Sequence, residues 1–263
     1  MEVKRQSNDS DQLTVGRNPV IELLKSSRPV DKILMTKVER GAGGSLLKIA
    51  AMAKERGIPV KEVAREKLDS LCPELNHQGV IAVAAACDYA ELSDIFAAAA
   101  AKNEPLFVVV CDEIEDPHNL GAIIRTADAA GAHGVIIPRR HGAGLTAATM
   151  RASAGAAQHL PVARVPNLPT ALETLKEQGA WIYAADLEGE SWCSVDYSGP
   201  VALVIGSEGA GVSRLMRERS DKIVSLPMCG AVNSLNASVA AGIVMYEIAR
   251  QRLRLPCAVV KAK

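Results

Sequence analysis

From residue 106 onward, the chain alternates short runs of almost continuous apolar residues with segments of helical pattern. Such strands between helices are typical of a parallel β-sheet covered by helices on both faces. Ligands bind to these sheets at the carboxyl ends of the strands, so the loops after residues 111, 206 and 227 are candidate site positions. The expected strands are 106–111, 134–138, 181–186, 201–206 and 222–227, and the expected helices are 119–132, 170–179 and a closing helix after residue 236.

The first ninety residues have a smaller pattern of the same kind. Segments 16–27 and 43–57 have the apolar rhythm of helices, 31–36 and 79–86 are typical of strands, and the alanine-rich segment 89–105 favours a helix. A chain of 263 residues with 48% hydrophobic content can form two cores. We therefore predict a flexible N-terminus (1–12), a small α/β domain (13–88), a linking helix (89–104) and a larger α/β domain (105–263).

Composition narrows the class of protein. No stretch approaches the roughly 18 uncharged apolar residues of a membrane helix, so we expect a soluble, cytoplasmic protein with no membrane partner. The six cysteines lie far apart, without a C-x-x-C pair or histidines at ligand spacing. Buried free thiols and no bound metal are expected. The formal net charge of zero permits RNA binding without indicating it.

Polar residues mark the first two loops. In the first, Asn119 stands where a helix cap is expected, and Arg125 follows in an otherwise apolar turn. A guanidinium that reaches past its apolar neighbours to solvent is the alternative for Arg125. The glycines of the second loop, GSEGAG, are spaced G-x-x-G-x-G, which differs from the dinucleotide fingerprint G-x-G-x-x-G. A tight turn explains Gly206 and Gly209 but not the carboxylate of Glu208.

The third loop leads directly into the closing helix. One of Asn233, Ser234 and Asn236 is expected to cap that helix, since these residue types are favoured N-caps. The helix itself, 237–252, is small or apolar around most of its first turns. We expect it to be buried against the sheet and against a second subunit.

Together, the three loops resemble the three motifs of the SpoU family, also called the TrmH family, of RNA ribose 2′-O-methyltransferases. The motifs stand in the family's order and at similar separations, and the resemblance covers nearly the whole chain. GRNPVIELL (16–24) and HQGV (77–80) are similar to the L30e-like RNA-binding domain of bacterial members that act on 23S rRNA, in particular those that methylate a guanosine ribose. The three motifs here are DPHNLGAIIRTADAAGAHGVII (116–137), LVIGSEGAGVSRL (203–215) and LPMCGAVNSLNASVAAGIVMYE (226–247).

The resemblance implies a fold and a reaction. It implies a C-terminal α/β trefoil-knot (SPOUT) domain that acts as a homodimer through its last helix and methylates a ribose 2′-hydroxyl of RNA with S-adenosylmethionine. A tRNA substrate, or a catalytically inactive rRNA-binding assembly factor, is the alternative. By motif position, the expected catalytic residues are Arg125, Asn119, Glu208 and Asn236, and the expected cofactor-binding residues are Gly206, Leu226, Leu235 and Ser234.

Two roles remain open for Arg125. The resemblance implies that it takes the proton of the 2′-hydroxyl, yet a guanidinium with a pKa above about 12 is a poor base near neutral pH. A bidentate clamp on the adjacent phosphate, which would lower the pKa of the hydroxyl, is an equal alternative.

Overall fold

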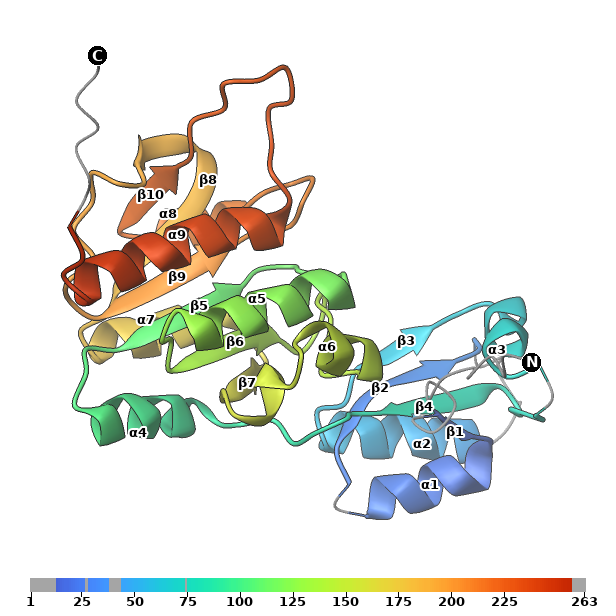
Figure 1. Cartoon of the computed structure of the whole chain (residues 1–263). Helices are drawn as coiled ribbons and strands as arrows, with labels where there is room; N and C mark the ends of the chain where they lie inside the picture. The colour runs from blue at the N-terminus through green and yellow to red at the C-terminus, as the bar shows by residue number, and fades with distance from the viewer. Residues whose placement is uncertain (1–12, 27, 38–43, 74, 257–263) are drawn as a thin grey trace, which may run out of the picture. The chain divides into compact units, whose positions relative to one another are not determined.

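The computed structural model describes residues 13–26, 28–37, 44–73 and 75–256, which divide into two compact units (Figure 1). The first unit contains the described residues up to Asp88 together with Gly144–Ala148. The second contains Tyr89–Ala143 and the described residues from Thr149 onward. The expected flexible segment 1–12 lies outside the described residues. Within the described ranges, no helix is long and apolar enough to span a bilayer.

The first unit is built on a four-stranded sheet in the order β1-β4-β2-β3. The fully buried side chains of Val20, Ile33 and Ile49 belong to its core. All the predicted helices and strands of this region are present, whereas β1, β3 and α3 were not predicted. The elements are β1 (Leu13–Val15), α1 (Arg17–Lys25), β2 (Val30–Met35), α2 (Gly44–Glu55), β3 (Val60–Glu62), α3 (Arg65–Leu71) and β4 (Val80–Ala84).

The second unit contains a six-stranded sheet in the order β10-β8-β9-β5-β6-β7, and every neighbouring pair is parallel. The predicted parallel sheet is therefore confirmed, while β7, α6 and α8 were not predicted. The strands are β5 (Phe107–Cys111), β6 (Gly134–Pro138), β7 (Val162–Val165), β8 (Trp181–Ser191), β9 (Val201–Ile205) and β10 (Lys222–Ser225). The helices are α4 (Leu92–Lys102), α5 (Pro117–Ala129), α6 (Ala147–Ala152), the 3-10 turn η2 (Ala156–Gln158), α7 (Leu168–Glu177), α8 (Arg214–Arg219) and α9 (Ala237–Arg252).

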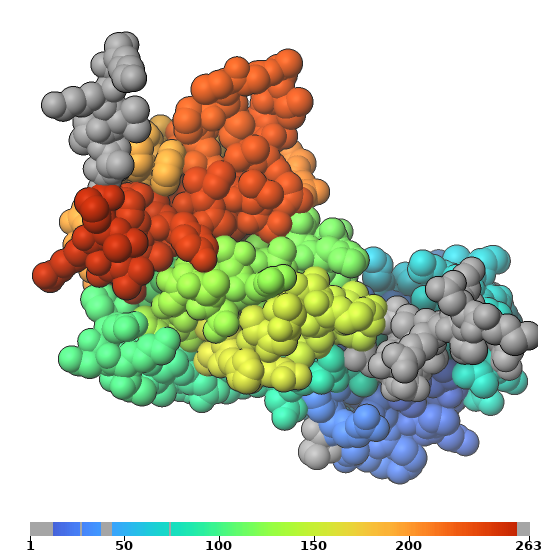
Figure 2. All heavy atoms as spheres, in the orientation of Figure 1, coloured from blue at the N-terminus to red at the C-terminus, as the bar shows by residue number. Residues whose placement is uncertain are grey.

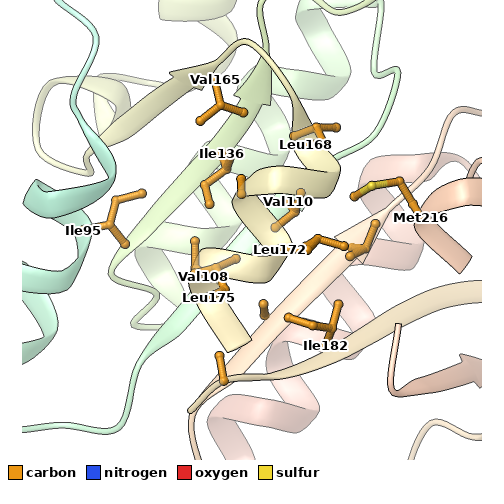
Figure 3. Packing of buried hydrophobic residues seen from close by; sticks show 14 of the residues in the cluster. Ile95, Val108, Val110, Ile136, Val165, Leu168, Leu172, Leu175, Ile182 and Met216 are labelled. Atoms are coloured by element: carbon orange, nitrogen blue, oxygen red, sulfur yellow. The ribbon is translucent and has the colours of Figure 1, made fainter. Parts of the chain in front are cut away.

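Helices cover both faces of this sheet. On one face, Ile95 of α4, Leu172 of α7 and Met216 of α8 pack in one apolar cluster with strand residues such as Val110 and Ile182 (Figure 3). The two remaining long helices, α5 and α9, lie side by side on the other face (Figure 1). Because α4 contributes to this cluster, the segment expected as a linking helix is part of the core of the second unit.

The first helix after β5 begins earlier than predicted. Its N-cap is Asp116, whose carboxylate accepts a hydrogen bond from the His118 N–H at 2.9 Å, and Pro117 occupies the first turn, where its missing N–H costs nothing. The prediction that Asn119 caps this helix is wrong. Asn119 lies inside the first turn and is buried, so its side chain is available for a different contact.

The last helix begins as predicted, at one of the three polar residues. Asn236 is its N-cap, because the side-chain oxygen accepts hydrogen bonds from the N–H groups of Ser238 (3.0 Å) and Val239 (3.3 Å). Residues 226–236, which connect β10 to this helix, are exposed over most of their length and stand out from the body of the second unit (Figure 2).

The expectation of buried thiols holds only in part. Cys72 and Cys111 are buried, and burial raises the pKa of the Cys111 thiol to about 12. Cys193 and Cys229 are exposed, so the expectation is wrong for them, and Cys257 lies outside the described residues.

Candidate functional site

Three polar side chains from the three motif loops meet at one edge of the parallel sheet. The amide of Asn119 donates to Glu208 Oε1 at 3.0 Å, and the amide of Asn236 donates to Asn119 Oδ1 at 2.9 Å. Asn236 also donates directly to Glu208 Oε1. The partners are 89 and 117 residues apart in the sequence, so the fold of the second unit brings this cluster together.

Asn236 has two functions in this arrangement. Its Oδ1 caps α9, and its Nδ2 contacts the other two members of the cluster. Nδ2 is a donor and Oδ1 an acceptor, so one planar amide can serve both partners at the same time. The result is a carboxylate, Glu208, that accepts hydrogen bonds from two neutral amides and stays open to solvent.

The second loop is closed by a tight backbone contact. Ser207 and Gly211 exchange backbone hydrogen bonds of 3.0 Å in both directions. A Cβ atom on Gly206 would lie 2.0 Å from the carbonyl carbon of Gly211, so only glycine allows the two backbone segments to approach this closely. The buried carboxylate of Asp112 accepts from the Ser213 N–H at 2.7 Å and ties the end of this loop to the end of β5.

A pocket of about 670 Å³, open solvent included, lies beside the cluster. Apolar side chains from β8, β9 and β10 and the loops that follow them supply most of its wall. All four predicted cofactor-binding residues are among the lining residues, namely Gly206, Leu226, Ser234 and Leu235.

A second hollow, on the other side of Glu208, is acidic. It is lined by Glu113, Ile114, Glu115, Asp116, Asn119, Ser207 and Glu208. Ser207 and Glu208 line both hollows, so the polar cluster stands at the boundary between them.

The composition of the first pocket suits S-adenosylmethionine. Apolar side chains such as Ile205, Val224 and Leu226 can enclose an adenine ring. A wall that excludes water also favours methyl transfer, because the sulfonium cation of the cofactor loses its charge in that reaction. Among the described residues, no group of three or more His, Cys, Asp or Glu side chains could hold a metal ion.

Arg125 is not part of this cluster. It lies six residues beyond Asn119 in α5, so the two side chains are separated by about 120° around the helix axis, and the Arg125 side chain is exposed. In the parts of the chain that the structure describes, it has no hydrogen bond or ion pair, and it lines neither hollow. Its role therefore stays a prediction.

Asp186 and Leu187 are among the lining residues that the sequence reasoning did not single out. Asp186 ends the apolar run of β8, which places a carboxylate at the carboxyl end of a parallel strand. That position is the signal that could have identified it, because the same rule selected the other three loops.

Comparisons with known proteins agree with this geometry. Residues 106–246 match the model of the SpoU rRNA Methylase family, and residues 13–90 match the one described as RNA 2′-O ribose methyltransferase substrate binding. YacO of Bacillus subtilis (strain 168), provisionally described as a TrmH family tRNA/rRNA methyltransferase, is 50% identical over 239 residues, which are 90% of this chain and 95% of YacO.

Two solved structures are also similar. The AdoMet-bound rRNA methyltransferase from Sinorhizobium meliloti is 28% identical, with a TM-score of 0.56, over 95% of this chain and 90% of that chain. The A. aeolicus TrmH/SpoU tRNA modifying enzyme is 34% identical, with a TM-score of 0.53, but the match covers 57% of this chain and 77% of that chain. The expected trefoil-knot fold and the use of S-adenosylmethionine are thereby confirmed, and the chain belongs to the SpoU (TrmH) family of RNA methyltransferases.

Proposed function

We propose that this protein methylates a ribose 2′-hydroxyl of RNA at the boundary between the two hollows, and that its substrate is a guanosine of 23S rRNA. The observation that carries the proposal is the cluster of Asn119, Glu208 and Asn236 beside a largely apolar pocket that all four expected cofactor-binding residues line. S-adenosylmethionine supplies a methyl group on a sulfonium ion when it is bound.

The loops of the second unit would hold the cofactor. Gly206 keeps the backbone of its loop folded against residue 211, while Leu226 and Leu235 contribute apolar wall and Ser234 a polar edge. Because most of this wall is apolar, it excludes water from the reacting atoms, and tight positioning of donor and acceptor can supply much of the rate enhancement.

The polar cluster would orient the target nucleotide. The carboxylate of Glu208 accepts from both amides, which fixes its direction without neutralising its charge. A fixed carboxylate can accept a hydrogen bond from a ribose hydroxyl or hold the guanidinium of Arg125. A protein that only binds RNA has no need of such a cluster at the edge of a cofactor pocket, which argues against an inactive assembly factor.

Arg125 would complete the site on RNA binding, as a base or as a clamp on the neighbouring phosphate. The two roles differ in their pH dependence. A rate of methyl transfer that stays constant from mildly acidic to mildly basic pH would exclude a titrating base and support the clamp.

A homodimer formed through α9 is part of the proposal. Val239 and Tyr246 on this helix are 51% and 56% exposed, whereas its other residues are buried or half-buried. Arg125 lies on the exposed side of the neighbouring helix, so it can act in its own protomer or across such an interface. Mixing Arg125→Ala chains with Asn236→Ala chains tests this, because the activity of mixed dimers exceeds that of both parent variants only if the arginine acts across the interface.

The N-terminal unit favours rRNA over tRNA. The match to the S. meliloti rRNA methyltransferase extends over both units, whereas the match to the tRNA modifying enzyme is limited to 57% of the chain. An rRNA substrate would also place the reaction in the cytoplasm. Within the first unit, Arg17 is a candidate RNA contact, although its guanidinium already donates to Gln78 O (3.0 Å) and Ser45 Oγ (3.2 Å).

The deciding experiment is transfer of labelled methyl from S-adenosylmethionine to separate pools of 23S rRNA, 16S rRNA and tRNA. Label at one alkali-resistant position of 23S rRNA, absent with Arg125→Ala, is the expected result. Label in tRNA would retain the chemistry and refute the proposed substrate. Tight RNA binding without label in any pool, tested also on ribosome assembly intermediates, would favour the assembly factor.

A further inference from the structure

Asp186 occupies a bulge in the strand that borders the cofactor pocket. In the pairing of β8 with β10, Ala184 lies opposite Ile223, but the next residue of β10, Val224, lies opposite Glu190. Residues 185–189 therefore have no partners on β10, although Ala185 still pairs with Ile205 of β9, and residues 186–189 form the bulge. Through this bulge, Asp186 and Leu187 become part of the pocket wall.

The carboxylate of Asp186 is largely buried, and only part of its hydrogen-bonding capacity is used. Its side chain is 9% exposed. Oδ1 accepts from the Leu187 N–H at 2.7 Å, and Oδ2 lies 3.3 Å from Nη1 of Arg217 on α8. A carboxylate offers about four acceptor positions, so each oxygen can accept one more hydrogen bond from a ligand in the pocket.

We propose that Asp186 binds the two ribose hydroxyls of S-adenosylmethionine. This inference rests on the proposed assignment of the pocket to that cofactor. An ionised carboxylate only accepts hydrogen bonds, so its partner must be a donor: the ribose diol, the adenine amino group or the ammonium group. Only the diol offers two adjacent hydroxyls to two oxygens, and hydrogen bonds to a carboxylate are stronger than neutral ones.

The surroundings of Asp186 disfavour the ammonium group. Arg217 already places a positive charge beside the carboxylate, and a second cation at the same site would be repelled by it. The neighbouring wall from Ile205, Val224 and Leu226 is apolar and suits the adenine ring, which is attached directly to the ribose. Arg217 is then a positioning residue that acts through Asp186.

A purely structural role makes a different prediction. If Asp186 and Arg217 only hold α8 against β8, removing the carboxylate would weaken every ligand of the pocket to the same extent. If Asp186 binds the diol, the loss would depend on whether the ligand has those hydroxyls. A comparison of two ligands therefore separates the roles, even if the variant is less stable than the wild type.

The test is calorimetric binding of S-adenosylhomocysteine and its 2′,3′-dideoxy analogue to the full-length wild type, Asp186→Asn and Glu188→Gln. Asn keeps an acceptor for the Leu187 N–H, and Glu188 is an exposed carboxylate two residues further along the same strand. We expect the wild type and Glu188→Gln to prefer the ribose ligand by about 10-fold to 100-fold, and Asp186→Asn to bind both ligands about equally. Arg217→Gln is expected to reduce the same preference.

Three outcomes would overturn the inference. Equal weakening of both ligands by Asp186→Asn, or an unchanged preference, would assign the carboxylate a structural role. Unchanged binding of 5′-methylthioadenosine to Asp186→Asn would identify the ammonium group as the partner, since that ligand keeps the ribose and lacks the amino-acid part. No binding of S-adenosylhomocysteine to the wild type would refute the cofactor assignment itself.

Discussion

The double role of Asn236 allows helix stability and methyl transfer to be separated by substitution. Asn236→Ala removes both the cap of α9 and the two donated hydrogen bonds. Asn236→Ser keeps a good capping residue but has no amide to donate to Asn119 and Glu208. We therefore expect the alanine variant to lose about 0.5–2 kcal/mol of unfolding free energy relative to the serine variant.

Both variants should lose activity to a similar extent. Hydrogen bonds to charged groups contribute about 1.5–3 kcal/mol when buried, and the exposure of Glu208 reduces this to about 1–2 kcal/mol. If the cluster acts in the transition state, kcat/KM falls about 5-fold to 30-fold.

Urea denaturation and methyl transfer to rRNA measure the two effects independently. Asp at this position is a useful third variant, since it caps the helix well but places a second carboxylate beside Glu208. Wild-type activity in Asn236→Ser would refute a role for the donated hydrogen bonds. Equal destabilisation by Ser and Ala would refute the assignment of Asn236 as the cap.

Three further predictions follow from the packing around the site. Gly206→Ala should abolish S-adenosylhomocysteine binding in calorimetry, because its Cβ would lie 2.0 Å from the carbonyl carbon of Gly211. Gly199→Ala is the matched control and should bind normally, because its Cβ would have no non-neighbouring atom within 4 Å and Gly199 does not line the pocket. Burial lowers the pKa of His133, so the unfolded state binds more protons than the folded state below pH 6.5, and the unfolding free energy should fall as the pH drops. In urea denaturations measured over a series of pH values, His133→Asn should show a smaller fall than the wild type. Arg252→Lys should lower the unfolding free energy by about 1–3 kcal/mol, because the guanidinium donates to three backbone carbonyls that a lysine ammonium cannot reach together. Thermal denaturation measures this change, and an unchanged midpoint temperature would refute the prediction.

The regular part of the larger unit could be predicted because its strands are short apolar runs. The structure confirms the five expected strands. β5, β6 and β9 are buried along almost their whole length and have no polar positions to obscure the pattern, whereas β8 and β10 are only partly buried and were identified by their short apolar runs. β7 was missed because Val162–Val165 contains a charged residue, Arg164, which interrupts the apolar run. The Arg164 guanidinium lies 4.9 Å from the ring centroid of Tyr89, and this cation–π contact stabilises it within the strand. β3 was missed because its three residues are all exposed.

The site was less accessible to sequence reasoning from spacing alone. Asn119 is expected as a cap because it stands at the start of the helical pattern 119–132, whereas the helix begins earlier, with Asp116 as its cap and Pro117 in its first turn. No periodicity connects Asn119 with Glu208 or Asn236, because these partners are 89 and 117 residues apart in the sequence. Only the tertiary fold brings their loops together. Those residues were identified by resemblance to a family. Asp186 is absent from the motifs of that resemblance, and only the pocket revealed it.

The exposed loop between β10 and α9 links the binding of two different ligands. Residues 229–236 face solvent, and this loop contributes Ser234 and Leu235 to the pocket. It ends at Asn236 of the polar cluster, which we propose orients the RNA. Fixing an exposed loop in one conformation costs entropy, and whichever ligand binds first bears most of that cost. Cofactor and RNA should therefore bind with positive cooperativity, and thermodynamic linkage requires each to strengthen the other by the same factor.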